Sequence, residues 1–250
     1  MLDVRGLSVE FDGFRAVDDV SLTVAAGSIV GIAGTNGAGK STLFAAIAGQ
    51  LAPAHGSISF HGAPITRLAP SARARLGLAR TFQVPREFGR LTVRENLLAA
   101  APNRHETLRA AWFARAAARR EEAGIAQRAD EVLALTGLTG VRDQWAANLS
   151  GGQKKLLELA RTLMCAPKCI LLDEPFAGVN PVLIEQLLHV LRAIHARGIA
   201  LVVIEHHLRA LSSLVPRLIV MDQGRTIADG APAAVLGDER VRAAYMGGVV

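Results

Sequence analysis

The chain has 250 residues, half of them hydrophobic and 4% aromatic, with a formal net charge of +6 at pH 7. This length supports one large domain, or a domain with a subdomain, whose core consists of Leu, Val, Ile and Ala. No run approaches the ~18 apolar residues of a membrane-spanning helix, and the N-terminus lacks the pattern of a signal peptide. We therefore expect a chain that is soluble by itself and reaches a membrane only through a partner. The positive charge suits a nucleotide, a nucleic acid or lipid headgroups without choosing among them.

The first elements are two strands, residues 2–11 and 17–24, separated by a turn that carries Phe11 and Phe14. An apolar strand at 28–33 then leads into a glycine-rich stretch, and a helix-like run at 40–49 follows it. Both the glycines and the helix that follows them contribute to phosphate binding. Glycines let backbone N–H groups approach an anion, and the helix N-terminus adds its dipole.

The glycine-rich stretch, Gly34 to Thr42, has the spacing of a phosphate-binding loop: Gly, four residues, Gly-Lys-Ser. In this pattern Lys40 reaches the β- and γ-phosphates and the hydroxyl of Ser41 binds Mg²⁺. A chance glycine-rich turn is the alternative, but the strand before the loop and the helix after it favour the phosphate site.

The middle of the chain changes from mixed to helical patterning. Beyond the loop we expect a short strand near residues 56–62, a helix at 70–76 and a strand at 78–83 that ends in Gln83. From residue 95 to residue 135 helix-forming residues dominate, and Pro102 divides an earlier helix from a later one. The many arginines of this helical insertion fit either a solvated face or a contact with a partner.

The second half alternates helices with buried strands, which implies a mainly parallel sheet covered on both faces. A glycine turn before Gln153 opens a helix that runs to about Cys165. We expect Cys165 and Cys169 to be small buried residues in a reducing compartment, because no cluster of ligands accompanies them. The remaining expected elements are strands at 168–175, 199–204, 218–221 and 226–228, a helix at 181–196 and a short helix that ends near residue 247.

Two adjacent acids, Asp173 and Glu174, end the apolar strand that begins at residue 168. A strand that stops at two carboxylates places them beside whatever the phosphate loop holds. Asp173 is then suited to Mg²⁺, and Glu174 to polarising an attacking water. Helix capping is the simpler alternative, but Pro175 follows directly and the strand is unusually apolar.

At this point the chain resembles the ATP-binding cassette (ABC) ATPases over nearly its whole length. The resemblance implies the ABC ATPase fold: an α/β P-loop core with a mainly parallel sheet, an N-terminal antiparallel β subdomain and a helical subdomain. It also implies a single domain in which residues 1–83 and 168–250 form the core and 84–167 the helical part. The motifs that carry it, in order, are Gly34 to Thr42, Gln83, Leu149-Ser150-Gly151-Gly152-Gln153, Leu172-Asp173-Glu174-Pro175 and His206.

The resemblance also implies ATP and Mg²⁺ as ligands and a role for each matching residue. Phe11 stands where such proteins stack an aromatic ring on adenine, with Phe14 as the weaker alternative. Gln83 is implied to sense Mg²⁺ and the γ-phosphate, and His206 to contact the γ-phosphate. The implied contacts to phosphate and Mg²⁺ come from Asn36, Gly37, Gly39, Lys40, Ser41 and Thr42, with Asp173 as the Mg²⁺ acid and Glu174 as the catalytic carboxylate.

In this family each ATP lies between the phosphate loop of one subunit and the signature of another. The resemblance therefore implies that Ser150, Gly152 and Gln153 act on a nucleotide held by a second ATPase subunit, in a head-to-tail dimer. Three positions depart from the family pattern: Thr35 replaces a common Pro, Asn180 a common Asp, and His207 follows His206 where Asp is common. None of these is in the main catalytic set.

Further stretches are similar to one branch, the ATPases of branched-chain amino acid importers, and the long helical insertion favours the larger of that system's two ATPases. They are Arg80-Thr81-Phe82-Gln83, Leu91 to Leu97, Ala177 to Pro181, Ile204-Glu205-His206 and Val241 to Gly247. The implied partners are two transmembrane permease subunits, a second ATPase subunit and, indirectly, a solute-binding protein. The chain would then lie at the cytoplasmic face of the membrane, without nucleic acid.

Other functions in the same superfamily remain open. Urea and amide importers share this branch, and exporters share every catalytic residue. A soluble ABC ATPase acting on ribosomes or nucleic acid is a second class of function, which the basic charge permits. Such proteins join two cassettes through a charged linker, and this sequence contains one phosphate loop and one signature. A nucleotide-binding regulator without turnover is a third, and the intact Lys40, Asp173, Glu174 and His206 argue against it.

Overall fold

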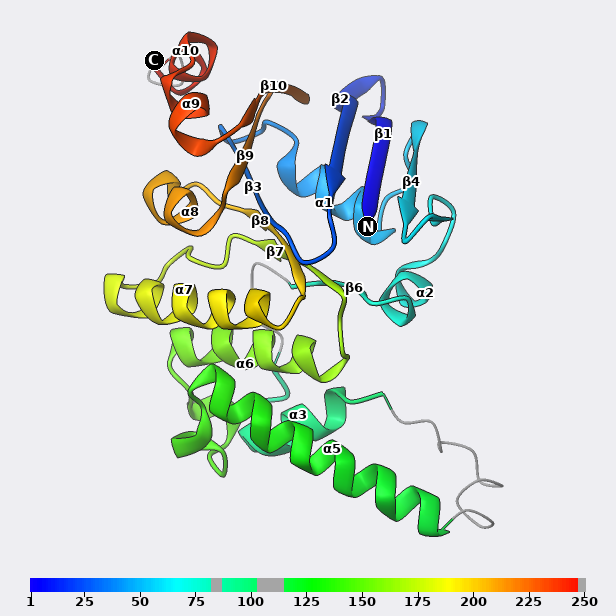
Figure 1. The fold of residues 1–250 in the computed structure, drawn as a ribbon, viewed down its shortest axis with the longest axis vertical. Helices are drawn as coiled ribbons and strands as arrows, with labels where there is room; N and C mark the ends of the chain where they lie inside the picture. The colour runs from blue at the N-terminus through cyan, green and yellow to red at the C-terminus, as the bar shows by residue number, and fades with distance from the viewer. Residues whose placement is uncertain (82–86, 103–114, 247–250) are drawn as a thin grey trace. The chain divides into compact units, whose positions relative to one another are not determined.

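The computed structural model describes residues 1–81, 87–102 and 115–246. The chain divides into two compact units, one formed by Met1–Gln83 with Lys168–Val250 and the other by Val84–Pro167. Each unit has buried apolar side chains of its own, and its helices and strands can be followed by their labels in Figure 1.

The first unit contains two sheets. One has four antiparallel strands in the order β2-β1-β4-β5, and the other has six strands in the order β10-β9-β3-β8-β7-β6. In the larger sheet β9, β3, β8, β7 and β6 run parallel, and β10 pairs antiparallel with β9. These sheets confirm the expected fold class. The strands are β1 (Leu2–Phe11), β2 (Phe14–Val24), β3 (Ile29–Gly34), β4 (His55–Phe60), β5 (Ala63–Pro64), β6 (Leu78–Arg80), β7 (Cys169–Asp173), β8 (Ala200–Ile204), β9 (Arg217–Asp222) and β10 (Arg225–Gly230).

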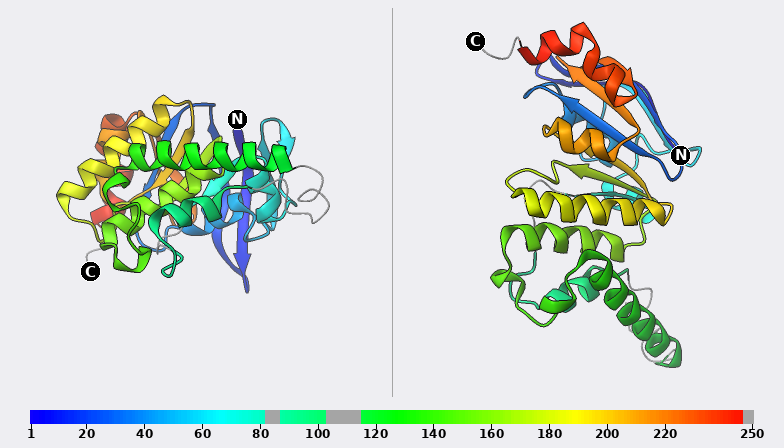
Figure 2. Two further views of the ribbon diagram at one scale, coloured as in Figure 1. Left: turned by 90° about the horizontal axis from the view of Figure 1, so that it is seen from below. Right: turned by 60° about the vertical axis from the view of Figure 1, so that its left-hand side comes forward.

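Helices cover the larger sheet because its central strands are apolar, apart from Asp173 at the end of β7. Every residue of β3, β7 and β8 is buried. Leu43, Phe44 and Ile47 of α1 share one core with side chains of both sheets, so α1 lies between the sheets, with α7 and α8 on the other side of the larger sheet (Figure 1 and Figure 2). The helices of this unit are α1 (Lys40–Ala48), α2 (Pro70–Arg75), α7 (Pro181–Ala196), α8 (Leu208–Leu214), α9 (Pro232–Gly237) and α10 (Glu239–Met246).

The second unit is helical, and its three longer helices, α3, α5 and α6, pack against one another. The fully buried Asn96 organises it: its amide donates to the carbonyls of Phe88, Leu91 and Thr92, and its oxygen accepts from the Phe88 N–H. A buried amide with this many partners fixes the loop before α3. The elements are α3 (Val93–Ala100), α5 (Arg115–Thr136), α6 (Gly151–Met164) and two 3₁₀ turns, η1 (Thr139–Val141) and η2 (Ala146–Asn148).

Some sequence-based boundaries were wrong. β2 begins at Phe14 rather than at residue 17, because a tight turn lets Phe14 pair with Phe11. β6 ends at Arg80, and residues 82 and 83 of the expected strand lie outside the described residues. The helices α8 and α9 were not predicted. Cys165 is exposed instead of buried, because it follows the last turn of α6, whereas Cys169 is buried within β7.

Candidate functional site

The glycine-rich loop connects β3 to α1 in a conformation that requires glycine. At Gly34 (φ +151°) a Cβ would lie 2.2 Å from the Met221 carbonyl oxygen, and at Gly39 (φ +91°) it would lie 2.2 Å from that of Ala16. Gly39 is also the N-cap of α1, where no side chain caps the helix and no acid lies in the first turn. The N–H groups of this helix end therefore remain available to an anion.

The turn between β9 and β10 is hydrogen-bonded to this loop. Gly224 donates its N–H to Ala38 (3.2 Å) and accepts from the N–H of Asp18 (2.9 Å). The hydroxyl of Thr35 donates to Oδ1 of Asp222 at 3.2 Å. Thr35 stands where the family commonly has proline, so the departure noted in the sequence adds a contact that proline cannot make.

Lys40 is folded back over its own loop. Its Nζ donates to the carbonyl oxygens of Gly34 (2.9 Å) and Thr35 (2.7 Å), and the residue is 5% exposed. Burial lowers the pKa of Lys40, and the charges of Glu174 and Asp173 oppose that shift. The ammonium is thus a desolvated donor beside two carboxylates, which suits a polyphosphate.

The two acids take different partners although they are adjacent in sequence. Asp173 ends β7, is 6% exposed and forms an ion pair with Arg80 (Nη2 to Oδ2, 2.7 Å). Glu174 has a left-handed backbone (φ +50°), and its Oε1 lies 2.5 Å from Nε2 of His206. The parallel register of β7 and β8, which pairs Asp173 with Ile204, accounts for this meeting of Glu174 and His206.

Glu205 is a site residue that sequence reasoning did not identify. It is 2% exposed, and its carboxylate accepts the N–H groups of Phe176 (2.5 Å), His206 (3.1 Å) and His207 (3.4 Å). Burial raises its pKa. Glu205 ties the segment after Glu174 to the segment that carries His206. The signal in the sequence was an acid placed directly after a buried apolar strand.

These elements enclose a pocket of about 330 Å³ in the first unit. It gathers most of the predicted residues of that unit. One aromatic differs from the expectation: Phe14, 67% exposed, lines the pocket, whereas Phe11 does not line it. Asp173 is buried next to the pocket-lining Glu174, and Gln83 lies outside the described residues. The lining residues are Phe14, Ala16, Asn36, Gly37, Ala38, Gly39, Lys40, Ser41, Thr42, Glu174 and His206.

The remaining predicted residues belong to the second unit, at the start of α6. Ser150 is the N-cap: its hydroxyl accepts from the Gln153 N–H (3.3 Å), and the Gln153 side chain accepts from the Ser150 N–H (2.9 Å). This reciprocal capping box orders the helix end, and no acid occupies the first turn. Gly152 is half-buried in that turn. A helix end of this kind favours an anion.

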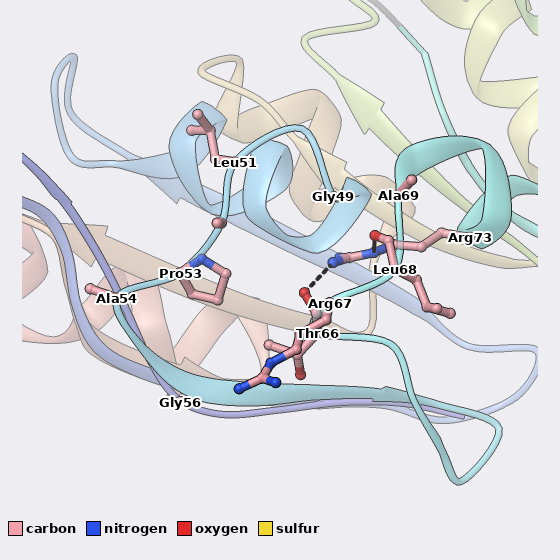
Figure 3. A pocket seen from close by; sticks show the side chains of 11 residues that line it. Gly49, Leu51, Pro53, Ala54, Gly56, Thr66, Arg67, Leu68, Ala69 and Arg73 are labelled. Atoms are coloured by element: carbon pink, nitrogen blue, oxygen red, sulfur yellow. Dashed lines mark hydrogen bonds between the residues drawn. The ribbon is translucent and has the colours of Figure 1, made fainter.

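A larger pocket of about 530 Å³ in the first unit is built differently (Figure 3). Its buried cation, Arg73, donates through Nε to Leu68 (2.9 Å) and through Nη2 to Thr66 (2.8 Å). Its Nη1 donates to the carbonyls of Ala46 and Ile47, which end α1. These donors are engaged with backbone oxygens, so Arg73 anchors the C-terminus of α1 rather than a ligand.

Two further features are absent from the described part of the chain: a cluster of metal ligands and a membrane-spanning helix. Among the described residues, no group of three His, Cys, Asp or Glu side chains could hold a metal ion. A divalent cation would therefore need oxygens from its ligand in addition to Asp173 and Ser41, which is how Mg²⁺ binds with polyphosphates. Within the same part of the chain, no helix has the length and apolar character to cross a bilayer.

Comparison with known proteins identifies the family of the chain. The sequence model of the family "ABC transporter" matches residues 17–177, and that of "Branched-chain amino acid ATP-binding cassette transporter" matches residues 225–250. The chain is 36% identical to a probable branched-chain amino acid transport ATP-binding protein LivG of Archaeoglobus fulgidus (99% of this chain, 95% of the relative). It is 35% identical to the lipopolysaccharide export system ATP-binding protein LptB of Escherichia coli K12 (98% and 97%).

Among solved structures, a nucleotide-free ATP-binding cassette from an ABC transporter matches with a TM-score of 0.85 and 35% identity, covering 98% of each chain. The family model spans well over half of this chain, and its relatives span nearly all of it. The chain belongs to the ABC transporter family, as an ATP-binding cassette that hydrolyses ATP to power transport.

Proposed function

We propose that this cassette powers the import of branched-chain amino acids or a related small polar solute. The match of residues 225–250 carries the proposal, because that family model describes one branch of transporter whereas the match of residues 17–177 is common to the superfamily. Urea and amide importers of the same branch are included in this solute class. Export is the second candidate, and the 35% identity to a lipopolysaccharide export protein favours it over soluble functions.

For the chemistry, we assign nucleotide contacts to the pocket of the first unit. The loop N–H groups, Lys40 and the start of α1 bind the phosphates, while Asp173 and Ser41 supply the protein oxygens for Mg²⁺. Bound there, Mg²⁺ would neutralise charge on the phosphate oxygens. Glu174 accepts a proton from the attacking water, and His206 orients its carboxylate through their 2.5 Å contact. Gln83 remains a predicted sensor.

Assembly requires a second cassette, because the signature in the second unit needs a nucleotide to act on. We assign Ser150, Gly152 and Gln153 to the ATP held by another copy or a sister chain, arranged head to tail. The first turn of α6, which contains no acid, supports this role. Closing and opening of that dimer would transmit the work of hydrolysis.

The second unit also offers a surface for the membrane subunits. Phe88 and Trp145 are 49% and 53% exposed, and exposed aromatics of this kind commonly form interaction sites. The guanidinium of Arg161 stacks on the Phe88 ring at 4.5 Å, and Trp145 pairs with Thr92 through a β-bridge, so both aromatics are held in place. We assign two permease subunits to this surface, which places the chain at the cytoplasmic face of the membrane.

Purification of the tagged chain from native membranes in mild detergent tests the transport proposal. We expect two polytopic proteins and a second ATPase to accompany it, as identified by mass spectrometry. Trp145→Ala should reduce their recovery, whereas Leu76→Ala, which removes an exposed apolar side chain of the first unit, should not. Reconstituted complex should then accumulate labelled leucine or a related solute. Recovery of ribosomal proteins or nucleic acid alone would contradict transport, and outward movement would favour export.

Two aromatics are candidates for stacking on adenine, and the pocket lining supports Phe14 over Phe11. Because Phe14 lines the pocket, we expect Phe14→Ala to weaken ATP binding by about tenfold, in keeping with the ~1–3 kcal/mol that stacking contributes per base. Phe11→Ala is the matched control, since Phe11 is also exposed and lies on the same hairpin. Isothermal titration with ATP measures both. A loss confined to Phe11→Ala would restore the original assignment of Phe11.

A further inference from the structure

Arg80 is the cation that neutralises Asp173. It ends β6, and its Nη2 lies 2.7 Å from Oδ2 of Asp173, with side chains 14% and 6% exposed. The adjacent Thr81 accepts the Asp173 N–H at 3.4 Å. Two consecutive residues of one segment therefore hold the carboxylate and the backbone of the residue that ends β7.

Arg80 is held in place by a third element. Its Nη1 donates to Oε1 of Gln50, which follows α1, at 2.5 Å. Its Nε is buried and has no hydrogen-bond partner among the described residues. Because this N–H of the partly buried guanidinium is unsatisfied, the charge of Arg80 depends on its contact with Asp173, and the two groups hold each other.

The other charges of the site are already engaged elsewhere. Lys40 donates to the carbonyls of Gly34 and Thr35, and Glu174 contacts His206. Among the described residues, Arg80 is thus the cation in direct contact with the Asp173 carboxylate, and the charge of Lys40 acts on it from farther away. A divalent cation that uses the same carboxylate therefore meets a ligand whose charge Arg80 already neutralises through Oδ2, instead of a free one.

We propose that Arg80 is a positioning residue that competes with Mg²⁺ for Asp173, and so sets how strongly ATP binding depends on Mg²⁺. The proposal rests on the proposed Mg²⁺ role of Asp173. Without Mg²⁺, the ion pair cancels a negative charge that would otherwise repel the triphosphate. With Mg²⁺, Asp173 exchanges one cation for another, and Arg80 reduces the gain from the metal.

The experiment compares ATP dissociation constants of the full chain in EDTA and in excess MgCl₂. Their ratio, EDTA over Mg²⁺, reports the coupling between metal and nucleotide. We expect Arg80→Met to raise this ratio by about tenfold, which corresponds to 1.4 kcal/mol, because ATP binding weakens in EDTA and does not weaken in Mg²⁺. Arg80→Lys retains a cation near Asp173 and should return the ratio toward that of the original chain.

A matched control removes another ion pair of the same unit. Arg217→Met breaks the contact with Asp229 (2.6 Å) on β9 and β10 and should leave the ratio unchanged. In an Asp173→Asn background, Arg80→Met should no longer change the ratio, since no carboxylate remains to be contested. Thermal unfolding of each variant shows whether it is folded. If Arg80→Met does not fold, Arg80→Lys tests the proposal by itself. A modest rise of the ratio above that of the original chain would then support the proposal.

The outcomes separate this inference from the proposed function. If the original chain shows no difference between EDTA and Mg²⁺, the Mg²⁺ role of the site is wrong and the inference falls with it. If the original chain shows coupling but Arg80→Met and Arg80→Lys leave the ratio unchanged, only the inference is wrong. A parallel loss of affinity in both conditions also overturns it, because a purely structural Arg80 would act that way.

Discussion

Glu174→Gln should bind ATP with the affinity of the original chain but hydrolyse it about 10²–10⁴ times more slowly, the range attributed to a general base. Glutamine preserves the shape of the side chain but cannot accept a proton. Glu174 lines the pocket, and its carboxylate contacts His206 at 2.5 Å. The amide can keep a hydrogen bond to the imidazole, so the loss should fall on the chemical step rather than on the fold.

The measurement is phosphate release by the intact transporter assembly, together with ATP binding by the variant alone. Glu185→Gln is a suitable control, because it replaces the same carboxylate by the same amide at an exposed position of α7. Turnover within a few fold of the original rate would contradict the assignment of Glu174. Loss of ATP binding in parallel would instead indicate that Glu174 supports the pocket.

The features that sequence predicted well are those determined by neighbouring residues. The apolar runs of β3, β7 and β8 required burial on both faces, and the structure buries every residue in them. The glycines of the phosphate loop were expected for their backbone freedom, and Gly34 and Gly39 have positive φ where a Cβ would clash with carbonyl oxygens. Local chemistry fixed both the sheet and the loop.

The features that sequence missed depend on strand order. Arg80 and Asp173 are 93 positions apart in the sequence and form an ion pair because β6 and β7 are parallel neighbours in the sheet. No local sequence pattern predicts that contact. Glu205 shows the same limit, since its three backbone donors come from segments before and after β8. The family resemblance favours Phe11 over Phe14 for adenine, whereas Phe14 lines the pocket, and no local pattern tells which side chain of a hairpin turns toward it.

Lys40→Met should reduce ATP affinity by about 10²–10⁴ fold, the second large effect. An ammonium that contacts two phosphates gives up two charge-assisted hydrogen bonds of about 1.5–3 kcal/mol each when it is removed. Methionine keeps a chain of similar length and no donor. Titration of ATP into the full chain in MgCl₂ measures the loss, and Lys168→Met, at a lysine just before β7 and outside the pocket lining, is the control.

The fold should survive this change, because two opposing effects on stability are removed together. Burial lowers the pKa of Lys40, so the folded state disfavours its charge, and an apolar side chain relieves that cost. The carbonyls of Gly34 and Thr35 lose their donor at the same time. We therefore expect a melting temperature within a few degrees of the original, at about 2–4 °C per kcal/mol for a chain of this size. Loss of binding with a much larger fall in melting temperature would mean that Lys40 chiefly holds the loop together, and that the phosphate contacts come from the backbone of α1.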